Sequence, residues 1–155
     1  MISKEVENAL IDFYINLAFI KLSYTDASSY AEMMLEMNNT KAILFSLLRA
    51  EYPDYSKLVK AVYSFTKIHY TIGEYSDDLI SKSVIYLQQK EASTSLIIDG
   101  LVTWGMLYFY AKNLRGAKCK LEEAERPCKA SQGDKGLQHA HILFWLGEIA
   151  IDEKH

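Results

Sequence analysis

The sequence predicts an all-α fold, and two observations carry that prediction. Only seven glycines and two prolines occur among the 155 residues, which is fewer than the turns of a β-sandwich or barrel normally require. Apolar residues return at steps of three and four almost everywhere, which is the spacing of one face of an α-helix. Half of the residues are apolar and 24% are charged, so the chain can bury a core. We therefore expect one domain, residues 1–155, built of antiparallel helix hairpins.

Four helices are expected in the first half of the chain. Their approximate ranges are Lys4–Leu22, Asp26–Met37, Thr40–Leu48 and Tyr55–Ile72. Asp26 and Thr40 can cap the second and third helices, because their side-chain oxygens can accept a hydrogen bond from a backbone N–H. The pair Asn38–Asn39 is expected to separate these two helices. Pro53 ends the third helix, and Gly73 ends the fourth because glycine adopts the left-handed conformation most easily.

Four more helices are expected in the second half, which makes seven or eight in all. Their approximate ranges are Ser76–Leu87, Thr94–Lys112, Arg115–Ala130 and Leu137–Asp152. Ser76 or Asp77 can cap the first of them, and Asn113 lies at the end of the second. The segment Ser131–Gly136 contains two glycines and is predicted to be the main linker.

Charge and cysteine content indicate a cytoplasmic protein that binds neither nucleic acid nor membrane. There are 17 basic and 20 acidic residues, which gives a net charge of −3 and argues against a large basic surface. No apolar run approaches the roughly 20 residues that span a bilayer, and no secretory signal precedes the first helix. Cys119 and Cys128 lie nine residues apart on one expected helix, about 13.5 Å, too far for a disulfide. Two reduced thiols are therefore expected.

The most distinctive spacing lies between Leu101 and Ala124. It reads LxxWGxxYxxxxxLxxAxxxLxxA. Gly105 permits two helices to approach closely, and Ala117 and Ala124 do the same on the second helix. This segment resembles the tetratricopeptide repeat, whose unit is a hairpin of two helices with large and small residues at these intervals. The resemblance implies a short stack of such hairpins that binds proteins or peptides in a concave groove.

Further copies of this spacing occur elsewhere in the chain. The segment Leu143–Ala150 reads LxxLGxxA, and Gly147 follows Gly105 by 42 residues, compared with a standard unit of roughly 34. Weaker copies begin at Val62 and at Ile11, where Thr66 and Ile15 replace the glycine. Together the copies cover about two-thirds of the chain, which is why a repeat architecture is preferred to an ordinary helical bundle.

Two other hypotheses stay open. The segment Asp99–Gly105 resembles the first homology motif of Bcl-2-like proteins, which would imply an apolar groove that binds a helix. Its Gly-to-Trp spacing is one residue too long, and Met106 stands where an arginine is usual. The repeat spacing is also compatible with the peptide-sensing domain of a bacterial regulator, although no DNA-binding segment is recognisable.

The sequence contains no pattern that favours an enzyme. His139 and His141 are two residues apart, so they point to different faces of a helix and no metal site is expected. Cys119 lies between two lysines, but no histidine is placed to activate it. Phosphate-binding loops and nucleophile elbows are lacking. We expect neither catalysis nor a cofactor or metal.

The expected binding residues come from the repeat resemblance. The positions that line the groove in the family correspond here to Tyr63, Lys67, Tyr70, Val102, Met106, Phe109, Tyr110, Phe144, Glu148 and Asp152. Aromatic residues and methionine beside a few charges suit the recognition of a protein or peptide. The alternative is that these side chains pack against neighbouring helices. If the hairpins stack in register, Tyr63, Tyr70, Phe109 and Tyr110 should share one surface.

The last expected helix carries more apolar residues than one buried face can hold. Trp145 and Ile149 lie on one side, whereas Phe144 and Ile151 lie on another. One side can pack on the preceding helix. The other is predicted to form an exposed apolar patch of several hundred Å², covered by a second copy in a homo-oligomer or by sequence outside this chain.

Overall fold

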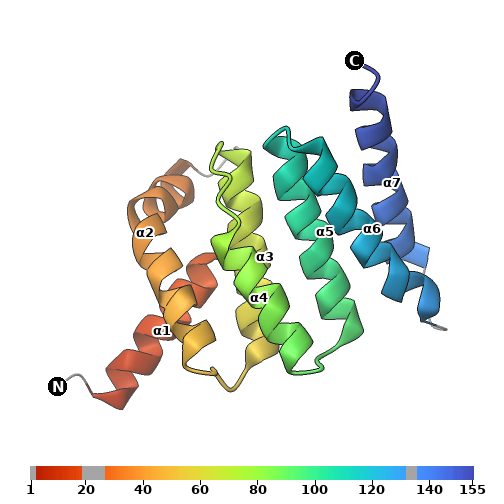
Figure 1. Cartoon of the computed structure of the whole chain (residues 1–155). Coiled ribbons are helices and arrows are strands. Elements are labelled where there is room, and N and C mark those ends of the chain that lie inside the picture. The colour runs from red at the N-terminus through yellow and green to blue at the C-terminus, as the bar shows by residue number, and fades with distance from the viewer. Residues whose placement is uncertain (1–2, 19–26, 132–135) are drawn as a thin grey trace. The chain divides into compact units, whose positions relative to one another are not determined.

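The computed structural model describes residues 3–18, 27–131 and 136–155. These residues form seven α-helices and no strand, so the all-α prediction is confirmed (Figure 1). The helices are α1 (Lys4–Ala18), α2 (Ala27–Arg49), α3 (Tyr55–Thr71), α4 (Asp78–Gln89), α5 (Thr94–Tyr110), α6 (Leu114–Ala130) and α7 (Gly136–Asp152).

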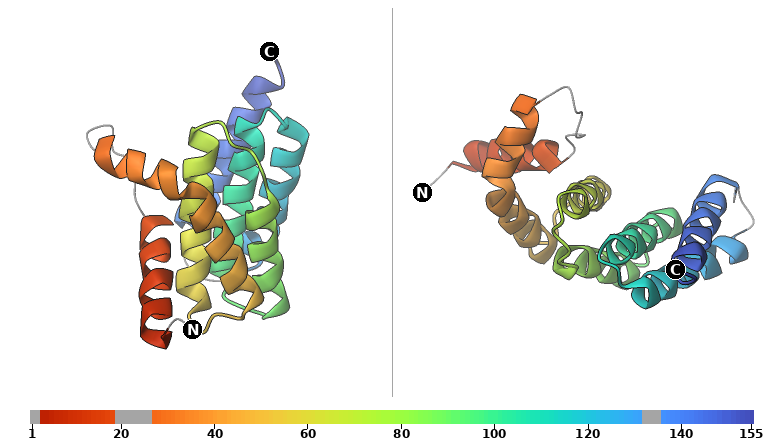
Figure 2. Two further views of the ribbon diagram at one scale, coloured as in Figure 1. Left: turned by 90° about the vertical axis from the view of Figure 1, so that its left-hand side faces the viewer. Right: turned by 90° about the horizontal axis from the view of Figure 1, so that it is seen from above.

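The chain divides into two compact units, residues 1–68 and 69–155, and the boundary lies near the end of α3. In the first unit, α1 packs on α2. In the second, α4, α5, α6 and α7 follow one another with alternating direction, and each packs on the next (Figures 1 and 2). The pair α5–α6 has the most extensive contact. The second unit contains the longest run of helix hairpins and most of the expected binding residues.

The predicted break at Asn38–Asn39 is wrong, because α2 runs through it without interruption. Thr40 is buried and donates its hydroxyl to the backbone oxygen of Glu36 at 2.9 Å, instead of capping a new helix. The Asn39 amide donates to the Glu36 carboxylate at 2.9 Å. Side chains that bond back to the preceding turn can remain inside a helix. The predicted cap Asp26 lies outside the described residues.

Glu36 also joins α2 to α1. Its carboxylate accepts a hydrogen bond from the Tyr14 hydroxyl at 3.1 Å, and this bond raises the pKa of Tyr14 above its ordinary value. The same Glu36 side chain therefore serves both the continuity of α2 and its contact with α1.

The predicted helix end at Gly73 is confirmed. Its φ is +87°, in the left-handed region, and the N–H of Glu74 donates to the backbone oxygen of His69 at 2.9 Å. This 6→1 bond closes the last turn of α3, as in many helices that end with glycine.

The predicted close approach at Gly105 is confirmed by the contact between α5 and α6. A Cβ atom at Gly105 would lie 2.9 Å from Cγ of Leu121 and 3.4 Å from the backbone oxygen of Ala117. Ala117, Leu121 and Ala124 are all fully buried. The glycine and the two alanines thus let the helix backbones approach, and Leu121 fills the remaining space.

Gly116 serves the same contact and was not singled out by the sequence pattern. A Cβ atom there would lie 2.8 Å from the Tyr108 ring and 2.6 Å from the Asn113 amide nitrogen. Asn113 accepts a hydrogen bond from the N–H of Gly116 at 3.0 Å and so caps α6. Asn113, which the sequence predicts only to lie at the end of α5, therefore caps the start of α6.

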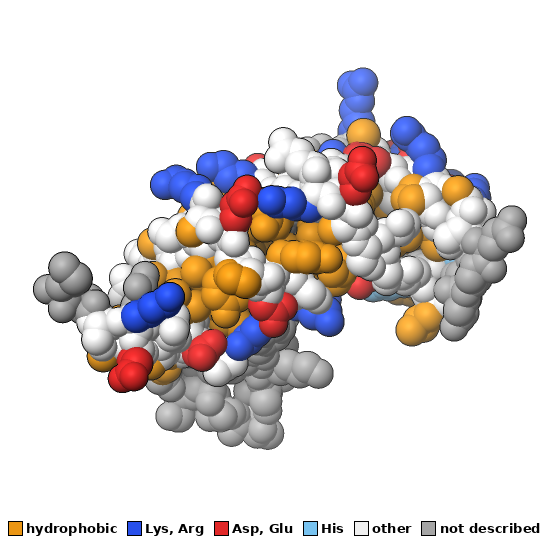
Figure 3. Space-filling model, turned by 90° about the horizontal axis from the view of Figure 1, so that it is seen from below, with side chains coloured by type: hydrophobic (Ala, Val, Ile, Leu, Met, Phe, Trp, Pro, Cys, Tyr) orange, Lys and Arg blue, Asp and Glu red, His pale blue; other side chains and the backbone are white. Residues whose placement is uncertain are grey.

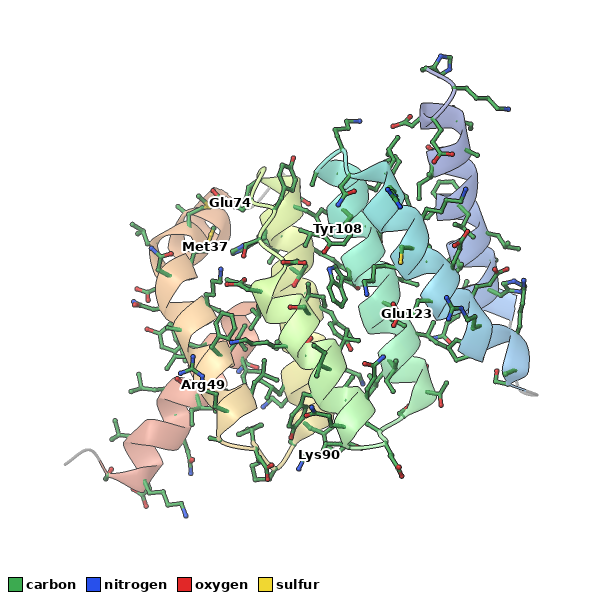
Figure 4. All side chains as sticks on the ribbon, viewed as in Figure 1. Met37, Arg49, Glu74, Lys90, Tyr108 and Glu123 are labelled. Atoms are coloured by element: carbon green, nitrogen blue, oxygen red, sulfur yellow. The ribbon has the colours of Figure 1, made fainter. Side chains whose placement is uncertain are left out.

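Asp77 precedes α4 but does not cap it with its side chain. Its carboxylate accepts hydrogen bonds from the Tyr108 hydroxyl and, at 3.3 Å, from the Trp104 indole. Tyr108 extends from α5 on the side of α4 (Figure 4). The Lys120 ammonium lies 3.9 Å from the Trp104 ring centroid. Asp77 therefore links the start of α4 to α5, because the helix–helix contact offers it two side-chain donors.

The contact between α6 and α7 combines apolar packing with a polar link between Glu125 and His139. Ile142 and Ile149 of α7 are buried. Glu125 of α6 lies 2.8 Å from the Lys129 ammonium and 3.3 Å from Nε2 of His139 on α7. These two partners, Lys129 first, hold the pKa of Glu125 below its ordinary value.

Candidate functional site

The structure separates the expected binding residues into buried, half-buried and exposed ones. Tyr63, Tyr70 and Val102 are buried. Met106, Phe109, Glu148 and Asp152 are half-buried, whereas Lys67, Tyr110 and Phe144 are exposed. Tyr63 and Lys67 belong to the first unit, and the others belong to the second.

Val102 is a correction to the expected site. Its side chain is only 5% exposed, so it belongs to the core of α5 and cannot line an open groove. Tyr63 is buried to the same extent and is likewise part of the packing around α3. The family offsets that select both positions do not take account of how deeply each side chain is buried in this chain.

Five aromatic side chains of the second unit form a continuous cluster across α3, α5 and α7. We define the aromatic cluster as Tyr70, Phe109, Tyr110, Phe144 and Trp145. The Tyr70 and Tyr110 rings stack with centroids 4.8 Å apart and an interplanar angle of 7°. Phe109 meets Tyr110 edge to face at 5.8 Å. Such offset or edge-on pairs are the favoured geometries of aromatic rings.

Trp145 is the hub of this cluster. Its ring lies 5.3 Å from Phe109, 6.1 Å from Tyr110 and 5.4 Å from Phe144, each pair close to edge-on. Its indole N–H donates to Nε2 of His141 at 2.9 Å. The sequence interpretation left Trp145 out of the site because the family offsets select its neighbours. The available signal was the i, i+4 spacing of His141 and Trp145, which places the two rings on one face.

Two further features frame the aromatic cluster. The Tyr70 hydroxyl lies 4.0 Å from Sδ of Met106, one turn before Tyr110 on α5. The Lys112 ammonium lies 5.7 Å from the Phe109 ring centroid and 3.6 Å from the Asp152 carboxylate of α7. The cluster is thus apolar at its centre, with a polarisable methionine beside it and one ion pair at its edge.

Part of the aromatic cluster is open to solvent. Tyr110 is 42% and Phe144 57% exposed, whereas Tyr70 is buried beneath Tyr110. Hydrophobic side chains also reach the surface among charged ones in the view of Figure 3. An exposed group of rings fixed by neighbouring rings presents a large contact area at low cost in conformational entropy.

Burial, and next the nearby Tyr110, raise the pKa of the Tyr70 phenol well above its ordinary value. As the pH rises through the ordinary tyrosine value near 10, the unfolded chain loses this proton before the folded protein does. The free energy of unfolding should therefore fall above about pH 10, and Tyr70→Phe should reduce that fall. Urea denaturation between about pH 9 and 11.5 measures it. An equal pH dependence in both proteins would contradict the burial of Tyr70.

The two histidines of α7 do not form a metal site in the part of the chain that is described. His139 pairs with Glu125, and His141 accepts from Trp145. Among residues 3–18, 27–131 and 136–155, no group of three or more His, Cys, Asp or Glu side chains is arranged to hold a metal ion. None of the helices in these ranges is long and apolar enough to cross a membrane.

No protein-family model matches the chain, and neither a curated protein nor a solved structure shows a significant match to it.

Proposed function

We propose that the protein is a non-enzymatic scaffold that binds a protein or peptide segment through the aromatic cluster. One observation carries this proposal: rings from three different helices are in continuous contact, and two of them, Tyr110 and Phe144, remain exposed. Aromatic residues and methionine are enriched where proteins bind partners. Aromatic rings bury a large apolar area with few rotatable bonds, and the flexible methionine side chain adapts to the shape of a partner.

The spacing of α5 and α6 supports a tetratricopeptide-like architecture for this scaffold. In the repeat pattern, small residues allow the two helices of a hairpin to approach closely. The contact between Gly105 and Leu121 is such a close approach. In stacked hairpins the first helices line one surface, and α5 and α7 supply four of the five rings of the aromatic cluster. The apolar centre of the aromatic cluster and the polar edge that the ion pair of Lys112 and Asp152 forms favour a segment that is apolar in its middle.

The binding site can be tested with a random peptide library displayed on phage and selected on the purified protein. A selected peptide should bind at least tenfold more weakly to Tyr110→Ala and to Phe144→Ala, since each change removes an exposed ring. Calorimetric titration measures the affinities. Trp145 offers a second readout, because its fluorescence should change on binding in a Trp104→Phe background that leaves it as the single tryptophan.

Tyr75→Ala is the matched control for this experiment. Tyr75 lies in the same unit as Tyr110 and is 43% exposed, but it is not part of the aromatic cluster. Its replacement should leave the affinity unchanged. Equal losses in Tyr75→Ala and Tyr110→Ala, with unchanged far-ultraviolet circular dichroism, would place the peptide elsewhere and contradict the proposal.

A further inference from the structure

One side of α7 is apolar along its length yet uncovered in the described structure. Ile142 and Ile149 are buried, whereas small and apolar residues of the opposite side remain at the surface. We call these residues the outer stripe: Ala140, Leu143, Phe144, Gly147, Ala150 and Ile151. Leu143, Phe144 and Ile151 are each at least half exposed. A helix with apolar residues on two sides is normally covered on both.

The molecule itself shows what kind of surface covers such a stripe. Leu101 and Gly105 of α5 precede Leu143 and Gly147 of α7 by 42 residues in both cases. On α5, Leu101 is buried and Gly105 lies against Leu121 of α6. On α7, Leu143 is exposed and nothing lies within 4 Å of a Cβ atom built at Gly147. The outer stripe therefore repeats the surface that α5 presents to α6, without a described helix against it.

The area of the outer stripe fits one helix better than a second copy of the chain. Large apolar side chains each carry on the order of 150–200 Å², so half-exposure of Leu143, Phe144 and Ile151 leaves about 300 Å². A stable dimer buries about 800 Å² per partner. A single helix laid into a groove needs only a few apolar anchors one turn apart.

Charge favours a partner helix that begins with basic residues. The outer stripe ends beside Glu153 and beside Asp152, which also pairs with Lys112. In an antiparallel pair such as α5 and α6, the first turns of the second helix meet the last turns of the first. The first turns of α6 carry Arg115, Lys118 and Lys120 and no acidic residue. A positive helix N-terminus with basic side chains complements an acidic end.

We propose that the outer stripe docks one amphipathic helix of a partner protein. That helix would carry a small residue, a leucine four positions on and a second small residue three positions later, as Ala117, Leu121 and Ala124 do in α6, with basic residues in its first turns. This site shares Phe144 with the aromatic cluster and otherwise extends away from Tyr110 along α7.

A synthetic peptide of residues 113–130, with both cysteines replaced by serine, is the probe. It should bind the full chain saturably, and a peptide with Leu121→Lys should not. Gly147→Leu in the protein should weaken binding at least tenfold, because the added side chain keeps the two helices apart. The fold should be preserved in this variant, since Gly147 has open space around it. Fluorescence anisotropy of a labelled peptide and circular dichroism measure both effects.

Tyr110→Ala separates this proposal from the binding at the aromatic cluster, because the peptide affinity should not change in that variant. Equal peptide binding by the wild-type protein and Gly147→Leu would overturn the proposal, as would the absence of saturable binding. If the peptide lost affinity for Tyr110→Ala but not for Gly147→Leu, it would bind at the aromatic cluster, and the proposal for the outer stripe would be wrong. A dimer that Gly147→Leu disrupts and that the peptide does not displace would assign the outer stripe to a second copy instead.

Discussion

Gly105→Leu should lower the free energy of unfolding by about 1–3 kcal/mol, with values at the upper end expected. Even the first added carbon would lie 2.9 Å from Cγ of Leu121 and 3.4 Å from a backbone oxygen of α6. Neither atom can move freely, because Leu121 is fully buried and the oxygen belongs to the helix backbone. Relief therefore requires α5 and α6 to move apart, which also loosens the neighbouring contacts. Urea denaturation followed by circular dichroism measures the change.

Gly147→Ala is the matched control for this substitution. Both glycines lie in helices at equivalent positions of the repeat spacing, but the control position has nothing within 4 Å of the added carbon. Replacing a helical glycine by alanine should then stabilise the protein by up to about 1 kcal/mol. Unchanged stability in Gly105→Leu would show that the two helices do not meet at this residue.

Leu121→Ala should cost about 2–5 kcal/mol, because it opens a cavity at the same helix contact from the other side. The Leu121 side chain is completely buried and lies directly against Gly105. Few groups can fill the space, since the residue that faces it has no side chain. Leu137→Ala is the control, because Leu137 is 84% exposed and its truncation should change stability little. Comparable losses in the two variants would contradict the packing of α6 on α5.

The two substitutions should not be additive. A leucine at position 105 would extend into the space that the truncated Leu121 vacates, so the double variant should be more stable than the sum of the single effects predicts. A coupling free energy of about 1–3 kcal/mol is expected for residues in such direct contact. The double-mutant cycle thus tests the pairing of these two side chains rather than their separate burial.

Local sequence sufficed for the fold class and for most helix ends. The spacing of apolar residues, Pro53 and Gly73 determine where a helix can run, because backbone geometry and one missing N–H act within a few residues. The spacing of Gly105, Ala117 and Leu121 also predicted a helix pair, since small residues matter only where another backbone comes close. The predicted helix break at Asn38–Asn39 was wrong, because whether a helix continues through these residues depends on hydrogen-bond partners such as the Glu36 carboxylate. The helix propensity of a residue type does not include such partners.

The packing of helices against one another determines which side chains of the candidate site meet and which remain exposed. Periodicity places Tyr70, Phe109 and Tyr110 on helix faces, but the order of the rings depends on the distance and rotation between helices. Trp145 became the hub, and Val102 became core, for that reason. Asp77 likewise became a partner of Tyr108 and Trp104 rather than a cap. Burial and ring contacts are properties of pairs of helices, whereas the sequence of one helix specifies only its own faces.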